Sequence, residues 1–202
     1  MLKLGHIPAM LSAQRETRLG DFAILKADFL GAQADNAVLP KLQPVVGYYP
    51  TTDLDELLTL PMESFGWVYA HHMRRNHLTP IAVSPELDDV ARRNVFALRY
   101  AITHDIFHVL LGFDTSYAGE IGVLAFAVAQ GYSRSLKLAL TLAKVIYPIL
   151  APGQRQAIAA NVQSGRALGE QTAFLLGYRF EDHWPESLDV VRDQLGLKLL
   201  GD

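Results

Sequence analysis

An apolar stripe at helical spacing constrains the fold of this chain more than any other feature of its sequence. The stripe recurs at steps of four, four, three, four, four and three residues, through Leu87, Ala91, Val95, Leu98, Ile102, Ile106 and Val109. Such spacing keeps side chains on one face of an α-helix. Pro85 and the acidic residues after it suit a first helical turn, and Gly112 suits a C-terminal cap. The pattern predicts one continuous helix over 85–111.

Helical periodicity also dominates the rest of the chain, and alternating β-type runs, internal repeats and an interdomain linker are absent from the sequence. We expect further helices over residues 15–31, 52–60, 62–76, from about 116 onward, 133–150, 153–177 and 185–195, with an irregular connection over 40–53. A length of 202 residues fits one domain. The sequence therefore predicts an all-α, single-domain bundle over 1–202, with about seven to nine helices.

Composition excludes several classes of function. Half of the residues are apolar, the net charge is only −3, and charges of both signs are interspersed, so no basic face for nucleic acid is expected. The chain contains no cysteine, which excludes disulfides, thiolate catalysis and cysteine-ligated metal sites and mildly favours a reducing compartment.

The most hydrophobic run, residues 136–153, contains Lys137 and Lys144 and is expected to stop at Pro148 and Pro152. It is too short to cross a bilayer. A buried core helix is the expected reading, and a helix lying on a membrane or against a lipid tail is the alternative.

The segment HDIFHVLLGFDTSYAGE, residues 104–120, carries a candidate metal site. At about 100° per residue, His104, Asp105 and His108 fall near 200°, 300° and 240° from Ile102, so the histidines share a face opposite the apolar stripe. Gly112 is expected to end the helix, and the next helix then returns Glu120 over the histidines. Two imidazoles and one or two carboxylates suit zinc, non-haem iron or manganese.

Chance remains an alternative to this metal site. Seven histidines in 202 residues give a pair at i, i+4 in roughly one such chain in four (7 × 7/202), so the spacing alone is weak evidence. The competing interpretation is a core histidine pair whose hydrogen bonds are satisfied within the protein.

The longer string RYAITHDIFHVLLGFDTSYAGEIGVLAFAVAQ, residues 99–130, resembles the coenzyme Q biosynthesis protein four family. That family carries His-Asp, two residues, His, eleven residues and Glu, and here the pattern is met by His104, Asp105, His108 and Glu120. Residues 57–80 and 165–197 are more loosely similar, so the resemblance covers most of 50–200, whereas residues 1–45 match no family that we can name.

The resemblance implies a protein of ubiquinone (prenylquinone) biosynthesis that binds a polyprenylated ring intermediate. Its partners would be this lipid, the other quinone-biosynthesis proteins and a membrane surface, with a homodimer among the expected assemblies and no nucleic acid. The expected location is cytoplasmic, peripheral at the inner face of the membrane. Apolar helices over 121–150 are expected to line a pocket for the prenyl tail.

The resemblance also implies metal-dependent oxidative decarboxylation of the ring carboxylate. His104, His108 and Glu120 would hold a divalent ion, with zinc expected first and iron or manganese as alternatives. Asp105 would be a fourth ligand or an acceptor that orients an imidazole. Arg99 would pair with a carboxylate or phosphate of the ligand, or else with a local acid. Asp105 and Arg99 are thus the catalytic candidates.

Two other classes of function stay open at this point. In the first, the protein is a non-catalytic lipid-binding scaffold that organises other quinone-biosynthesis enzymes, and the metal only braces the hairpin. In the second, it is a zinc-dependent hydrolase, because His-Asp-x-x-His differs by one methylene from the His-Glu-x-x-His of metalloproteases. Asp105 would then act as the general base.

Overall fold

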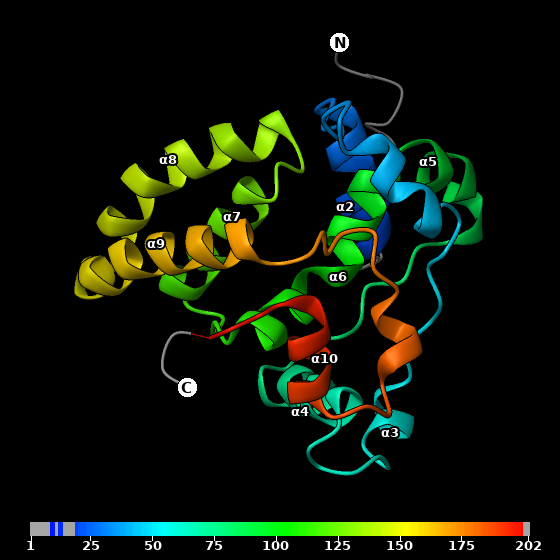
Figure 1. Cartoon of the computed structure of the whole chain (residues 1–202). Helices are drawn as coiled ribbons and strands as arrows, with labels where there is room; N and C mark the ends of the chain where they lie inside the picture. Colours follow the sequence, from blue (N-terminus) through cyan, green and yellow to red (C-terminus); the bar gives the residue numbers. More distant parts are fainter. Residues whose placement is uncertain (1–8, 11, 14–18, 200–202) are drawn as a thin grey trace.

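Helix α6 (Val95–Leu111) lies at the centre of the molecule, and the other elements are arranged around it (Figure 1). The structure is a computed structural model that describes residues 9, 10, 12, 13 and 19–199. Its other helices are α2 (Leu19–Phe29), α3 (Leu54–Leu57), α4 (Phe65–Arg75), α5 (Asp88–Arg93), α7 (Tyr117–Ala129), α8 (Arg134–Leu150), α9 (Arg155–Gln171) and α10 (Leu188–Leu195), with 3-10 turns over Leu39–Val45, Pro85–Leu87, Pro152–Gln154 and Phe180–His183. Within these residues no strand forms, so the all-α, single-domain prediction is confirmed.

The elements gather on α6 in three groups. Helices α2 and α5 pack along its first half, α4 and α10 lie against its second half, and α7, α8 and α9 form a lobe on the remaining side (Figure 1). The faces of α6 are covered, and Leu98, Phe107 and Leu110 are each 0% exposed. His108 is buried in this way, whereas His104 on the same helix keeps 29% of its side chain exposed.

The prediction of one continuous helix over 85–111 is wrong, because the helix breaks at Asn94. This residue has φ −115° and ψ 63°, and its side chain accepts a hydrogen bond from the Ala97 N–H as the N-cap of α6. Its amide group also donates to the Ala32 carbonyl at 2.9 Å. The apolar periodicity continues across the break, because residues on both sides of it pack against the same two residues of α2, Ile24 and Leu25.

The two helices of the central hairpin end and begin where the sequence predicts. Gly112 takes the left-handed conformation (φ 72°) that ends α6, and the Ser116 hydroxyl caps α7 by accepting from the Gly119 N–H. The last carbonyl groups of α6 are satisfied from far along the chain, since Arg192 of α10 donates to Val109 and Leu110 at 3.0 and 3.1 Å. The C-terminal helix therefore fixes the end of α6.

The backbones of helices α7 and α9 are in direct contact where Gly165 of α9 meets Gly122 of α7. A Cβ placed on Gly165 of α9 would lie 2.2 Å from the Gly122 carbonyl oxygen of α7, which is backbone and cannot move aside cheaply. A Cβ on Gly119 would lie 1.8 Å from the Asp114 carbonyl oxygen at the start of the same hairpin. Both contacts require glycine because two backbones meet directly.

We expect Gly165→Ala to lower the free energy of unfolding by about 1–3 kcal/mol, because overpacking forces α7 and α9 apart. Gly153 is the matched control, since a Cβ there meets nothing within 4 Å. Gly153→Ala should change the stability by less than about 0.5 kcal/mol. Urea denaturation followed by circular dichroism measures both, and equal stability of the two variants would refute the close contact.

Helix α8 differs from its predicted form in two ways. Its backbone runs through Pro148 to Leu150 instead of stopping at the proline. The expected buried core helix is also wrong, because Leu140 and Ala143 are its only buried residues. Among the described residues no single helix is long and apolar enough to cross a membrane; α8 and residues Pro152–Gln171 reach that length and composition only as a pair bent by 114°.

Candidate metal centre

Three predicted ligands converge where α6 meets the first turn of α7. The Nε2 atoms of His104 and His108 each lie 3.4 Å from an oxygen of Glu120. One donor atom from each of the three residues lies within 4.8 Å of the other two. The hairpin therefore brings His104, His108 and Glu120 to one point, as the sequence predicted.

Local structure accounts for this convergence. The histidines are one helical turn apart on α6, so their rings lie on one face, with centroids 4.9 Å apart. The turn through Gly112 reverses the chain, and the Ser116 cap fixes the start of α7. Glu120 lies in the first turn of that helix, where a carboxylate is favoured by the helix dipole.

His108 is held in the form that a metal ligand needs. Its side chain is fully buried, and its Nδ1 lies 3.2 Å from the Phe113 carbonyl oxygen. A carbonyl only accepts hydrogen bonds, so Nδ1 carries a proton in the neutral and in the charged ring alike, and Nε2, which faces Glu120, is the nitrogen that can bind a metal once it loses its proton.

The spacing of the donors also fits a metal. Nitrogen and oxygen ligands at 2.0–2.2 Å from a tetrahedral zinc ion stand about 3.3–3.6 Å apart. Each nitrogen lies 3.4 Å from a different oxygen of Glu120, which matches this range and exceeds a normal N–H···O hydrogen bond. With one donor atom from each residue the separations reach 4.8 Å, so the ligands would close in slightly around an ion. His108 Nε2 is in addition a buried atom without a hydrogen-bond partner. The donor set and its spacing thus fit a small divalent cation.

The protonation of His108 makes metal binding pH-dependent. Burial lowers the pKa of His108, but the Glu120 carboxylate, the Phe113 carbonyl and Asp105 raise it by more, so the net pKa lies above its ordinary 6.5. In the metal-free chain, the stability from the protonated His108 is fully present below pH 6.5 and is lost as pH rises through the raised pKa. Metal binding has the opposite dependence, because the ion replaces that proton.

We therefore expect the apparent metal affinity to fall as pH decreases, beginning at a higher pH than for a free imidazole. Below the raised pKa of His108, each further pH unit should weaken binding about tenfold or more. Titration calorimetry with zinc between about pH 5.5 and 8 checks this dependence. An affinity that does not change with pH would mean that the metal does not displace a proton from His108.

Asp105 lies beside the cluster but outside it. Its Oδ1 is 3.7 Å from His104 Nδ1, the nitrogen on the opposite edge of the ring from the one that faces Glu120. Burial raises the pKa of Asp105, but the imidazoles of His104, His108 and His72 lower it by more, and the carboxyl is held below its usual range. The carboxylate is thus placed to orient His104, and it is a weak base at neutral pH.

Arg99 points away from the cluster. Its guanidinium is fully buried and pairs with Glu181 at 2.8 Å, donates to the Tyr178 carbonyl at 2.8 Å, and lies 5.6 Å from the centre of the Tyr48 ring. Of the two partners expected from the sequence, a ligand anion or a local acid, the structure contains the local acid.

Sequence reasoning missed two side chains of the site. His72 of α4 stacks on His108 with ring centroids 6.1 Å apart, and burial holds its pKa below the ordinary value. Tyr100 meets the edge of His104 at 6.0 Å. Tyr100 is one helical turn before His104, so its spacing could have revealed it, whereas His72 has no signal in the sequence because only the packing of α4 on α6 brings it in. A cavity of about 390 Å³ is lined by His72 and His108 on this side, but by neither His104 nor Glu120.

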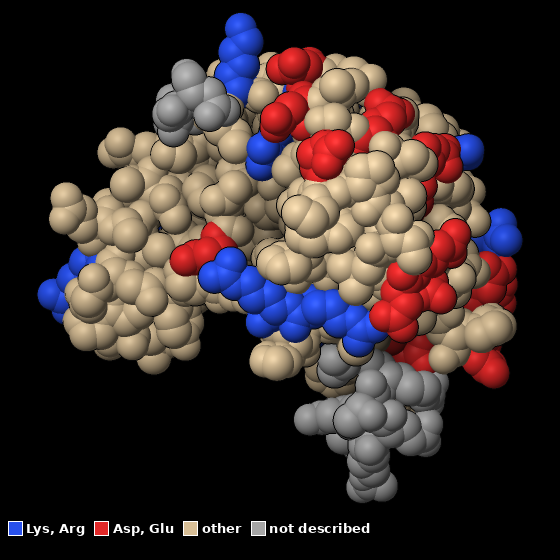
Figure 2. All heavy atoms as spheres, turned by 90° about the horizontal axis from the view of Figure 1, so that it is seen from below, with Lys and Arg blue, Asp and Glu red and all other residues tan. Residues whose placement is uncertain are grey.

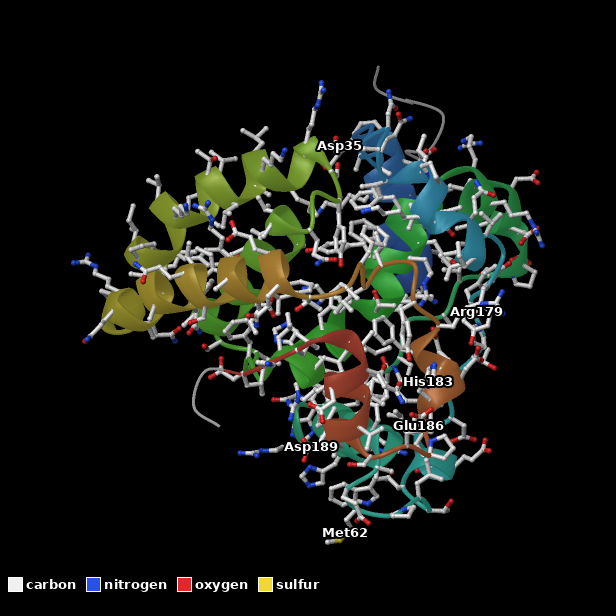
Figure 3. The ribbon with its side chains drawn as sticks, viewed as in Figure 1. Asp35, Met62, Arg179, His183, Glu186 and Asp189 are labelled. Carbon is white, nitrogen blue, oxygen red and sulfur yellow. The ribbon has the colours of Figure 1, made fainter. Side chains whose placement is uncertain are left out.

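Two further histidines, His71 and His183, lie apart from the cluster. His71 stacks on Trp67 at the surface of α4. His183 pairs with Glu186 in the segment before α10, where Figure 3 shows the two side chains beside each other and away from α6. Neither adds a ligand to the three donors.

The fold and the site together define an all-α protein with a candidate divalent-metal centre of two histidines and one glutamate in a central helical hairpin. The family model of the coenzyme Q (ubiquinone) biosynthesis protein Coq4 matches residues 35–200, and the chain belongs to this family. The resemblance predicted from residues 99–130 is thereby confirmed.

Relatives and a solved structure agree with this assignment. The chain is 30% identical over 155 residues to the mitochondrial ubiquinone biosynthesis protein COQ4 homolog of Bos taurus, covering 73% of this chain and 55% of that protein. It is 26% identical over 200 residues to mitochondrial COQ4 of Eremothecium gossypii, covering 97% and 56%. The chain thus spans about half the length of the curated relatives it matches. A crystal structure of a protein from Nostoc punctiforme shares the fold, with a TM-score of 0.68, 24% identity and 96% of both chains covered.

Proposed function

We propose that this chain binds one divalent metal ion through His104, His108 and Glu120 and acts on a polyprenylated ring intermediate of ubiquinone biosynthesis. The reaction proposed is the oxidative removal of the ring carboxylate. The observation that carries the proposal is the convergence of three donor atoms within 4.8 Å, in a chain whose family is named for this pathway.

Each residue of the site would have a separate role. His104 and His108 supply neutral nitrogen donors, and Glu120 supplies one negative charge. Asp105, whose Oδ1 is 3.7 Å from the far nitrogen of His104, would orient that ring. When bound, the ion supplies positive charge that stabilises the oxygens of a ring carboxylate or phenolate. Arg99 has no catalytic part in this proposal, because Glu181 occupies its guanidinium.

The oxidation limits the choice of metal. In the oxidative removal the bond from the ring to the carboxylate breaks, carbon dioxide leaves, and a hydroxyl group derived from water takes its place on the ring. This releases two electrons, which zinc cannot accept. With zinc, an external oxidant such as molecular oxygen must take the electrons directly, whereas iron or manganese has redox chemistry of its own. Two histidines and a carboxylate suit all three ions.

One alternative keeps specific support. A lipid-binding scaffold that organises other quinone-biosynthesis enzymes at the inner face of a membrane, as a monomer or homodimer, agrees with the exposed apolar side chains of α8. A zinc hydrolase with Asp105 as general base is less favoured. The lowered pKa of Asp105 makes it a poor base, and it faces the wrong edge of His104 for a bound water.

Release of carbon dioxide from a prenylated hydroxybenzoate labelled at its carboxylate tests the proposal. Metal-loaded wild type, with oxygen, should release the label, and Glu120→Gln should lose at least about 100-fold of this activity because the donor set loses its charge. Glu170→Gln is the matched control, since Glu170 is an exposed glutamate that pairs only with Arg166. Wild type that binds metal and lipid without releasing label would favour the scaffold.

A further inference from the structure

The outward side of α8 is a continuous apolar surface. Its members are all exposed, at 63% for Leu138, 52% for Leu142, 63% for Val145, 45% for Ile146 and 69% for Ile149. We refer to these five side chains as the α8 outer face. On a helix they fall within about 100° of one another, directly opposite the buried Leu140. These five side chains therefore point to solvent and are not part of the hydrophobic core of this chain.

The lobe that carries this face has a net positive charge. Residues 117–171 contain five cationic side chains and two acidic ones, Glu120 and Glu170, of which Glu170 pairs with Arg166, although the whole chain has a net charge of −3. The cationic residues are Arg134, Lys137, Lys144, Arg155 and Arg166. Figure 2 shows the same separation, with the end that carries α8 and α9 mostly uncharged and blue at its edge, and most acidic residues toward the other end.

Two exposed lysines lie beyond one edge of the apolar face. Lys137 and Lys144 are seven residues apart and point about 80–100° around α8 from Val145, the nearest member of the face. Neither forms an ion pair with any acid among the described residues. An apolar stripe flanked by lysine is the pattern of a helix that lies in the interface of an anionic membrane.

We propose that the α8 outer face docks on the surface of an anionic lipid bilayer. Its five apolar side chains would enter the boundary between headgroups and acyl chains, and the flanking lysines would meet the headgroup phosphates. The proposal deepens the proposed function by naming the surface that meets the membrane, and it does not depend on chemistry at the metal centre.

Charge favours a bilayer over a second copy of this chain. In a two-fold symmetric dimer each patch meets itself, so two lobes of the same net positive charge would be brought together. Like charges at such an interface repel. An anionic lipid surface instead satisfies both the apolar side chains and the cations.

Docking in this way places the metal centre one helix layer from the bilayer. The opposite side of α8 faces α7, where Tyr147 meets Tyr117 with ring centroids 5.0 Å apart. The charge of Glu120 helps to raise the pKa of Tyr147, after the larger effect of burial, so Tyr147 lies within electrostatic reach of Glu120.

Binding of the full chain to vesicles tests the proposal. Flotation with phosphatidylcholine vesicles is compared with flotation on vesicles that contain roughly one part phosphatidylglycerol to three parts phosphatidylcholine. The expected result is binding at least about tenfold tighter to the anionic vesicles, which weakens as salt is raised. Equal binding to both vesicles, or no binding to either, would overturn it.

Variants of the outer face provide the apolar arm of the test. Val145→Glu/Ile149→Glu should weaken binding to anionic vesicles at least about tenfold, because two apolar anchors become anionic. Met62→Glu/Val190→Glu is the matched control, since these residues are 67% and 47% exposed on other elements, and it should bind within about twofold of wild type. Circular dichroism verifies that both variants fold.

Variants of the lysine flank provide the charge arm. Lys137→Glu/Lys144→Glu should also lose at least about tenfold in affinity, because each lysine near such a surface contributes about fivefold. Lys26→Glu/Lys198→Glu makes the same charge change elsewhere and should lose less. Equal losses in the two variants would mean that the affinity for vesicles depends on the net charge of the chain and not on the position of the lysines on α8.

Two further results separate the possible failures. His108→Ala should float with anionic vesicles as wild type does, so the membrane surface and the metal centre are tested independently. If size-exclusion chromatography shows a dimer that Val145→Glu/Ile149→Glu separates into monomers while vesicle binding is unchanged, the face is covered by a second copy and the proposal is wrong.

Discussion

Replacing His108 by alanine is expected to remove the metal from the purified protein almost completely. The substitution deletes one of three donors from a site in which His104 and Glu120 would be left to hold the ion. Changes in residues that merely orient a ligand cost about 10–100-fold in metal affinity, so loss of a ligand itself should exceed about 100-fold. Elemental analysis after dialysis, followed by calorimetric titration with zinc, iron(II) and manganese(II), measures the loss and identifies the preferred ion.

A histidine outside the cluster provides the control. His71→Ala removes a surface imidazole of α4 that stacks on Trp67, and should keep the metal content of wild type. In wild type, metal at 100 times its Kd should raise the free energy of unfolding by about 2.7 kcal/mol, and this increment should vanish in His108→Ala. Equal metal content in both variants would mean that His108 does not bind the metal, and the histidines would then be a structural pair.

Arg99→Met is expected to be the most destabilising of the substitutions considered, lowering the free energy of unfolding by about 3–5 kcal/mol. The change leaves Glu181, whose side chain is 8% exposed, as a buried carboxylate without its cation. Two carbonyl groups also lose a donor, those of Tyr178 and Tyr48. Chemical denaturation at neutral pH measures the effect.

A double variant distinguishes a structural from a ligand-binding role for Arg99. Arg99→Met/Glu181→Leu removes both charges and should recover most of the lost stability, because a buried ion pair is often replaceable by apolar groups. Arg166→Ala breaks an exposed pair with Glu170 and should cost less than about 1 kcal/mol. A stable Arg99→Met protein that no longer binds a prenylated ring acid would contradict the structural role and restore the ligand-binding one.

The parts of the site that the sequence predicts are those that depend on neighbours along the chain. His104 and His108 share a face because they are four residues apart, and Gly112 and Ser116 set the reversal that returns Glu120. Each step is a local rule of helix geometry or capping, and each is visible in a short string of residues. The all-α class follows in the same way from the periodicity of apolar positions.

The parts that the sequence does not predict depend on packing between distant segments. Asn94 ends a helix because its side chain reaches Asp28 and Ala32 of another element, and nothing near residue 94 announces this. Glu181 meets Arg99 across eighty-two residues of chain, and His72 meets His108 through the packing of α4 on α6.

Helix α8 shows a different limit of sequence reasoning. Its composition, apolar with two lysines, is compatible with a core helix, and only the structure shows that Leu140 and Ala143 face inward while most of its apolar side chains face outward. A helix that is apolar on both sides carries no pattern that tells the side facing the protein from the side facing a partner.

The contacts that Arg192 and Glu181 make with α6 affect the order in which the chain can fold during its synthesis. The three ligands lie within residues 104–120, so they leave the ribosome well before the residues that complete the burial of α6. Arg192 caps α6 and Glu181 neutralises Arg99, so neither contact exists in a nascent chain that ends near residue 170. The hairpin can therefore bind metal before the C-terminal segment packs on α6. An arrested nascent chain of this length should display the ligand hairpin to a metal donor before the domain closes over it.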